Sequence, residues 1–177
     1  TGTVATATQN SITTATGLTA VGATGTASAI AGIPFYRGDG DNTSIYTHDV
    51  SGTDSTAQGN TAYGIQAMDA ITTGDNNTAI GEQSLTSITT GSANTAVGRL
   101  SLKTVSTGVN NIAVGYEALK ANNGDANVAI GYQALLANTT GASNIAIGST
   151  ALGATTTGVR NIAIGSNALD LQDTEND

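Results

Sequence analysis

A nine-residue pattern that returns about every 17 residues constrains this chain more than any other feature. It reads Asn, a Thr or aliphatic residue, Ala, an aliphatic residue or Tyr, Gly, two variable residues, a small residue, and Leu or Met. Its central glycines are Gly64, Gly81, Gly98, Gly115, Gly131, Gly148 and Gly165, spaced by 17 residues except for one interval of 16. A short fixed period over more than half of a chain indicates a stack of repeated structural units.

Each repeat contains an alternating stretch that is typical of a β-strand. In residues 144–148, Ile145 and Ile147 point to one side and Ala146 to the other, since successive side chains of a strand face opposite ways. Alanine fills this middle position in every repeat, which indicates a place with room only for a methyl group. We predict one strand from Asn to Gly and a second extended piece around Ala151 and Leu152.

The side of the strand opposite the alanines changes along the chain. The residue after Asn is Thr in the first three repeats and aliphatic in the last four, as in Thr95 and Ile112. We therefore expect this side to become more buried toward the C-terminus, and aliphatic residues such as Ile147 and Leu152 to form the core. The single short interval falls in the turn at residues 120–123, where a deletion disturbs strand pairing least.

Stacked coils would bring equivalent residues of neighbouring repeats to about 4.8 Å from each other. The amides of equivalent asparagines could then hydrogen-bond along the stack, because each amide both donates and accepts. The glycines would allow tight corners with positive φ. The predicted structural Asn ladder consists of Asn60, Asn77, Asn94, Asn111, Asn127, Asn144 and Asn161.

The predicted fold class is all-β: a parallel β-roll or β-helix solenoid of ~17-residue coils, preceded by an extended N-terminal segment. Each coil contains few large apolar side chains, so a single chain has a thin core. Three chains that share one axial core would bury more apolar surface, and we predict a homotrimer. A monomeric solenoid is the alternative.

Four segments follow from the composition. Residues 1–33 form an extended Thr/Ala/Gly-rich segment, 34–58 a transition and docking segment, 59–171 the seven-coil array, and 172–177 an acidic end beyond which the array could continue. The second segment concentrates the few aromatic and Arg residues, which are enriched at protein interfaces. The docking candidates there are Phe35, Tyr36, Arg37 and Tyr46.

Composition argues against several functions. A net charge of −8 with only five Lys and Arg does not suit nucleic acid binding, and no apolar run is long enough for membrane insertion. His48 is the one histidine, the chain has no Cys, and no carboxylate pair recurs in the array, so we predict no catalytic residues, no metal site, no cofactor and no enzymatic activity. Asp75 and Asp125 occur in turns that only faintly suggest calcium.

Tyr116 and Tyr132 share one repeat position, where they could stack on a sugar or simply be exposed. Residues 37–39 spell Arg-Gly-Asp, which we interpret as chance.

The repeat resembles that of known fibre proteins. Residues 77–81, 131–135 and 138–141 look like the repeat of bacteriophage tail-fibre and head-fibre proteins, notably those of marine phages, over about residues 60–171. The Asn-x-Ala-Ile-Gly core is also similar to the heads of trimeric autotransporter adhesins. Either resemblance implies a trimeric, left-handed parallel β-roll or β-helix.

The phage resemblance implies a structural fibre shaft at the virion surface that contributes to host attachment. Its expected partners are two further copies of the chain, other virion or fibre proteins that bind the N-terminal segment, and a host surface glycan or receptor. The alternative function is a bacterial surface adhesin or a self-assembling extracellular filament.

Overall fold

The computed structural model describes residues 28–30, 33–35, 45–46 and 56–170. These residues contain short strands and no helix. Strands β1 (Ser28–Ile30) and β2 (Ile33–Phe35) pair antiparallel. The other strands form one parallel sheet in sequence order: β3 (Ile45–Tyr46), β4 (Thr61–Tyr63), β5 (Thr78–Ile80), β6 (Thr95–Val97), β7 (Ile112–Val114), β8 (Val128–Ile130), β9 (Ile145–Ile147) and β10 (Ile162–Ile164).

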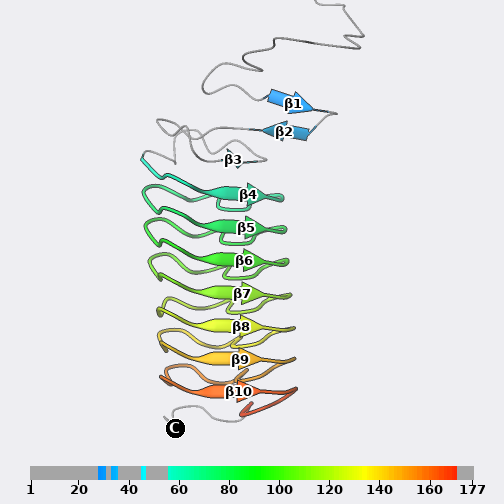
Figure 1. Cartoon of the computed structure of the whole chain (residues 1–177), viewed down its shortest axis with the longest axis vertical. Helices are drawn as coiled ribbons and strands as arrows, with labels where there is room; N and C mark the ends of the chain where they lie inside the picture. Colours follow the sequence, from blue (N-terminus) through cyan, green and yellow to red (C-terminus); the bar gives the residue numbers. More distant parts are fainter. Residues whose placement is uncertain (1–27, 31–32, 36–44, 47–55, 171–177) are drawn as a thin grey trace, which may run out of the picture.

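The array is a β-solenoid, as the repeat predicts. Figure 1 shows β4 to β10 stacked one above another, with each coil returning to place its strand beside the previous one. Equivalent residues pair directly, so that Ala79 lies opposite Ala96. Ala113 lies opposite Ala129 even though these two are only 16 residues apart. The missing residue is therefore accommodated outside the strand, and the register of the sheet is preserved.

The prediction of a second extended piece in each coil is wrong. Residues 149–154 form turns, and Leu152 has a φ of +50°. Thr150 in the same turn has a φ of +54°, and the equivalent residues of another coil, Glu117 (+55°) and Leu119 (+50°), repeat this pair of positive angles. Because a strand requires φ near −120°, these residues curl the chain back. Hydrogen bonds between coils continue on this side nevertheless, as from Leu119 N to Ala134 O (3.0 Å).

The interior contains narrow columns of equivalent residues. The alanines of the strands are at most 2% exposed, in agreement with a position that admits only a methyl group. In the coils of β4 to β10, the large buried side chains lie outside the strands. One column of them consists of Met68, Leu85, Leu102, Leu119, Leu135 and Leu152, each at most 1% exposed.

The expectation that the outer strand residues become buried toward the C-terminus is wrong for the single chain. Ile112 is 41% exposed and Ile162 is 62% exposed, and Ile147, which we expected in the core, is 36% exposed. The physical reason is the alternation of the strand. Since Ala points inward, both of its neighbours point outward, and leucines from the turns fill the space inside.

A second interior column changes character at the same coil as the outer face. It contains Ile71, Ile88 and Val105 in the first coils, and then the buried polar residues Asn122, Asn138 and Thr155. At this point the first outward residue of the strand, which follows the ladder asparagine, changes from Thr95 to Ile112. The C-terminal coils therefore have less apolar volume inside and more apolar surface outside.

Two sets of glycines let the coils approach each other. Gly115 has a φ of +137°, and a Cβ there would lie 2.4 Å from the carbonyl oxygen of Gly131 in the next coil. Gly124 represents the second set: a Cβ there would lie 2.1 Å from the oxygen of Gly141. The first set needs both the unusual backbone angle and the space, whereas Gly124 is required by the space alone.

Candidate functional site

The Asn ladder lies inside the solenoid. All seven of its asparagines are buried, at most 4% exposed. Asn111 illustrates the bonding: Oδ1 of Asn94 accepts from its backbone N (3.0 Å) and from its Nδ2 (3.2 Å). The same Nδ2 donates to the carbonyl oxygen of Gly124 (2.9 Å). The ladder satisfies buried backbone groups from coil to coil, so these residues hold the rod together and offer no binding surface.

The two aspartates that faintly suggested calcium bond to the backbone instead. Oδ1 of Asp75 accepts a hydrogen bond from Gln58 N (2.8 Å), and Oδ1 of Asp125 accepts one from Val109 N (2.9 Å). Each carboxylate thus connects its coil to the preceding one. Within the described ranges, no group of three His, Cys, Asp or Glu side chains is placed to hold a metal ion.

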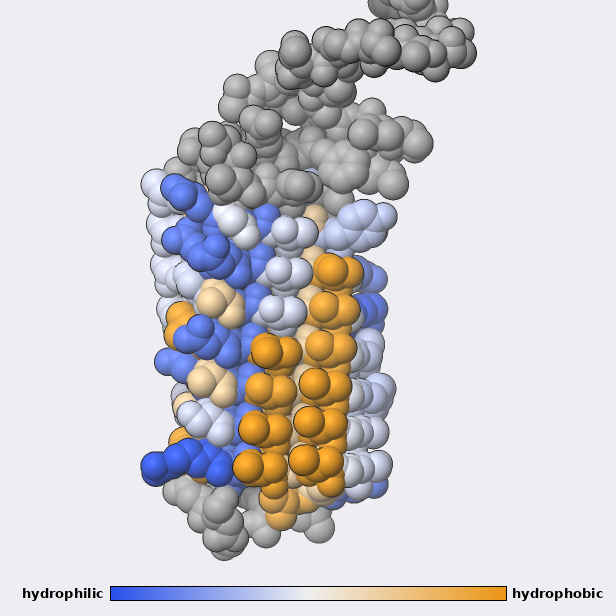
Figure 2. Space-filling model, viewed as in Figure 1, coloured by the Kyte–Doolittle hydropathy of each residue, from blue (hydrophilic) through white to orange (hydrophobic). Residues whose placement is uncertain are grey.

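The outward side of the sheet is a continuous uncharged face, which we call the sheet face. Figure 2 shows two adjacent columns of side chains along the array, apolar over most of their length. Contiguous exposed apolar side chains of this kind make the sheet face a candidate interaction site. The sheet face consists of Thr61, Tyr63, Thr78, Ile80, Thr95, Val97, Ile112, Val114, Val128, Ile130, Ile145, Ile147, Ile162 and Ile164.

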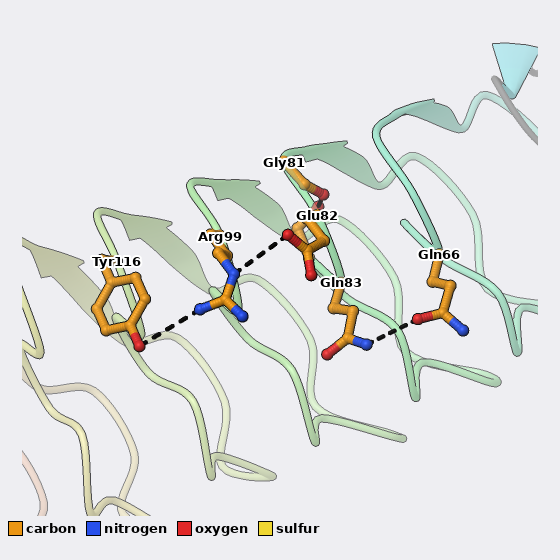
Figure 3. A network of polar contacts seen from close by, with 7 residues as sticks. Gln66, Gly81, Glu82, Gln83, Arg99 and Tyr116 are labelled. Carbon is orange, nitrogen blue, oxygen red and sulfur yellow. Dashed lines mark hydrogen bonds and ion pairs between the residues drawn. The ribbon is translucent and has the colours of Figure 1, made fainter.

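A second exposed column follows the corner glycines, with one side chain per coil. Figure 3 shows Glu82, Arg99 and Tyr116 in a row. Arg99 Nε donates to Glu82 Oε2 (3.2 Å), and its guanidinium carbon lies 5.7 Å from the centre of the Tyr116 ring. On its other side Tyr116 stacks on Tyr132, with ring centres 5.6 Å apart and planes inclined by 13°. The prediction that these two tyrosines are equivalent is confirmed, and they contact each other.

A parallel row of polar side chains lies beside this column. Gln83 Nε2 donates to Gln66 Oε1 (2.7 Å), as Figure 3 shows. In later coils, Glu117 accepts from Lys120 Nζ (2.6 Å) and from Gln133 Nε2 (2.8 Å).

These contacts shift two pKa values. The hydrogen bond from Lys120, followed by that from Gln133, holds the pKa of Glu117 below its ordinary value. The hydrogen bond to Glu82, together with its charge, raises the pKa of Arg99. Arg99 is therefore charged at any physiological pH.

We expect Glu117→Gln to lower the free energy of unfolding by about 1 kcal/mol at neutral pH, because the substitution removes a charge-assisted hydrogen bond. A carboxyl group whose pKa is lowered by folding stabilises the folded state above its unfolded pKa. This contribution disappears as the pH falls through the folded pKa. Urea unfolding at neutral and acidic pH measures the effect, and the variant should approach the parent at acidic pH.

Glu82→Gln is the control, because its ion pair with Arg99 is half exposed, at 46% and 50% for the two side chains. Exposed ion pairs contribute little to stability, so we expect a smaller loss. An equal loss in both variants, or a Glu117→Gln effect that does not depend on pH, would contradict this role for Glu117.

Of the docking candidates, only Tyr46 has a described side chain. Tyr46 is fully buried, so the prediction that it contributes to docking is wrong. It belongs to β3, which pairs with β4 and extends the sheet ahead of the predicted array. Phe35 lies in β2. Tyr36 and Arg37 lie outside the described residues, as do His48 and the Arg-Gly-Asp tripeptide.

The sequence interpretation missed the extent of the sheet face and the position of Arg99 over Tyr116. Both could have been found by aligning the repeats. The residues that follow the seven glycines form one column, and Arg99 and Tyr116 are adjacent in it.

Comparison of the chain with protein-family models, with curated proteins and with solved structures gives no match. The likeness to fibre repeats therefore depends on the repeat residues alone and remains a prediction. Among the described residues, no helix has the length and apolar character needed to cross a membrane.

Proposed function

We propose that this chain is the shaft of a fibre at the surface of a virion, where it contributes to host attachment, and that three copies associate along their sheet faces. The observation that carries the proposal is the sheet face itself. It runs the length of a rod made of similar coils and contains no charged residue. A rod whose coils all present an uncharged face can associate with another copy over its whole length.

Charge distribution supports association between identical copies. The chain has a net charge of −8, which would oppose self-association through most of its surface. An uncharged face avoids like-charge contacts, and burying apolar side chains favours association by about 25 cal/mol per Å².

The change in the C-terminal coils gives a second argument. From Ile112 onward both outward columns are aliphatic, whereas the interior contains Asn122 and Asn138. Such coils bury less apolar surface within one chain, so they benefit more from a partner. The assembly is then held most firmly along its C-terminal half.

Immunogold electron microscopy with an antibody against residues 59–170 tests the proposed location. We expect labelled fibres projecting from purified phage particles in a lysate of the producing culture, and we expect the antibody to reduce adsorption of those particles to host cells. Label on the surface of intact cells, with none on particles, would contradict a virion fibre and favour the cellular adhesin or filament.

A further inference from the structure

The column that follows the corner glycines changes abruptly after Tyr132. Its members in chain order are Ile65, Glu82, Arg99, Tyr116, Tyr132, Ser149 and Ser166. Long side chains occupy successive coils up to Tyr132, and each lies against the next from Glu82 onward. The next two members are serines, whose side chains are too short to cover an aromatic ring.

The two tyrosines differ in how much of each ring is covered. Tyr116 lies between Arg99 and Tyr132, and it is 37% exposed. Tyr132 has Tyr116 on one face, and it is 53% exposed. The coil on its other side bears Ser149, since Tyr132 O accepts a hydrogen bond from Thr150 N (2.8 Å). One face of the Tyr132 ring is therefore open to solvent, above two serines.

We propose that the open face of Tyr132 binds a neutral hexopyranose unit of a surface glycan. This inference rests on the proposed role in host attachment and identifies where on the shaft a ligand would be held. The sugar ring would occupy the level of Ser149, one step along the stack, as Tyr132 itself lies one step beyond Tyr116.

The chemistry of the site suits a sugar. One face of a hexopyranose presents several C–H groups, which carry partial positive charge and pack on the negative face of an aromatic ring. The hydroxyls at the sugar's edge need polar partners. Ser149 and Ser166 are exposed, and their hydroxyls form no hydrogen bond within the described part of the chain. They can donate to the sugar and accept from it.

The stack also fixes the platform before the ligand arrives. Tyr116 and Arg99 support the first face of Tyr132, and Glu82 in turn bonds to Arg99. A ring that is already held in place loses little conformational entropy on binding. The two positions beyond Tyr132 carry no charge, and the acidic chain disfavours anionic sugars, so a neutral sugar is the better fit.

Saturation-transfer NMR with the full chain tests this proposal. The probes are methyl β-glucopyranoside, methyl β-galactopyranoside, methyl α-mannopyranoside and N-acetylglucosamine, each at about 10 mM because single sugar contacts are weak. We expect at least one probe to receive saturation, most strongly at the ring C–H protons of one face. The double variant Tyr116→Ser and Tyr132→Ser removes both rings of the stack, and it should abolish the signal.

Two further variants separate the site from a general effect on folding. Ser149→Leu should cover the open face of Tyr132 with an aliphatic side chain that offers no aromatic face, and it should abolish binding in a folded rod. Tyr63→Ser removes an exposed tyrosine on the sheet face and should leave binding unchanged. Transfer to none of the probes, or transfer that persists in the double Tyr variant or in a folded Ser149→Leu rod, would overturn the proposal. Tetramethylammonium serves as a cationic comparison probe. Saturation transfer to it and to none of the sugars would also overturn the proposal, in favour of a cation site.

This experiment is independent of the location of the chain. If a sugar binds but the antibody labels cells, the glycan site stands and the virion assignment fails. If the antibody labels particle fibres but no sugar binds at Tyr132, the fibre assignment stands and the glycan site fails.

Discussion

Gly115→Ala is expected to lower the free energy of unfolding by about 3–5 kcal/mol, the sum of a strained backbone and a steric clash. The φ of +137° at Gly115 lies in a region that residues with a Cβ rarely adopt. The added methyl group would also lie 2.4 Å from the oxygen of Gly131. That oxygen belongs to the backbone of the next coil, so it can retreat only if the two coils move apart.

Two other glycines separate these two effects. Gly165 has a φ of +127°, but the nearest atom to an added Cβ is 4.0 Å away, so Gly165→Ala should cost only the strain of about 1–3 kcal/mol. A Cβ at Gly124 would lie 2.1 Å from the oxygen of Gly141. Gly124→Ala should therefore show the cost of the clash, about 2 kcal/mol or more.

Urea unfolding followed by circular dichroism measures all three variants. Gly165→Ala and Gly124→Ala should each be less stable than the parent, and Gly115→Ala, which combines strain and clash, should lose the most. A Gly115→Ala rod as stable as Gly165→Ala would show that the coils can separate at no cost. It would contradict the close approach of the coils as the reason for glycine at this position.

The sequence predicted the solenoid because its period is regular. Seven glycines and seven alanines at fixed intervals define the coil and the parallel register. The asparagines were also identifiable, because only a residue that donates and accepts can bond to its own equivalent in the next coil. Each of these inferences depends on one residue type repeating at one position.

The interior of the coil was harder to predict, because it depends on backbone angles that residue type does not reveal. Leu119 adopts a φ of +50°, an angle that leucine seldom takes, and this turn brings leucine into the core. Without it, the strand isoleucines were the natural choice for the core. The structure places Ile147 outside and Leu152 inside, so a pattern of alternation alone could not decide which side of the strand faces inward.

The candidate functional surface was partly predictable, because part of it depends on one repeat position. The tyrosine pair followed from the repeat position, whereas the open face of Tyr132 follows from the two serines beyond it. Tyr46 was misassigned because an aromatic residue in an irregular segment favours an interface as readily as a core. Pairing of β3 with β4 places it in the core.

The double substitution Ile130→Glu and Ile147→Glu is expected to convert the assembled rod into folded single chains. Both side chains point outward from the sheet face, at 39% and 36% exposure. If three copies pack along this face, the glutamates place like charges in an apolar interface. We expect association to weaken by roughly 100-fold or more, which corresponds to about 2.8 kcal/mol. Sedimentation at micromolar concentration, with circular dichroism to verify folding, measures the change.

Two matched pairs show whether the position of the charges matters. Thr140→Glu with Thr157→Glu places the same two charges at the same spacing on exposed turns, and it should leave the assembly intact. Thr78→Glu with Thr95→Glu places them on the sheet face of the earlier coils, where one outward column is still Thr. Less apolar surface surrounds them there, so we expect an intermediate loss. The order of the losses of association in the three pairs therefore tests whether the later coils hold the assembly together. Equal losses in all three pairs would trace the effect to net charge and would contradict the sheet face as the interface.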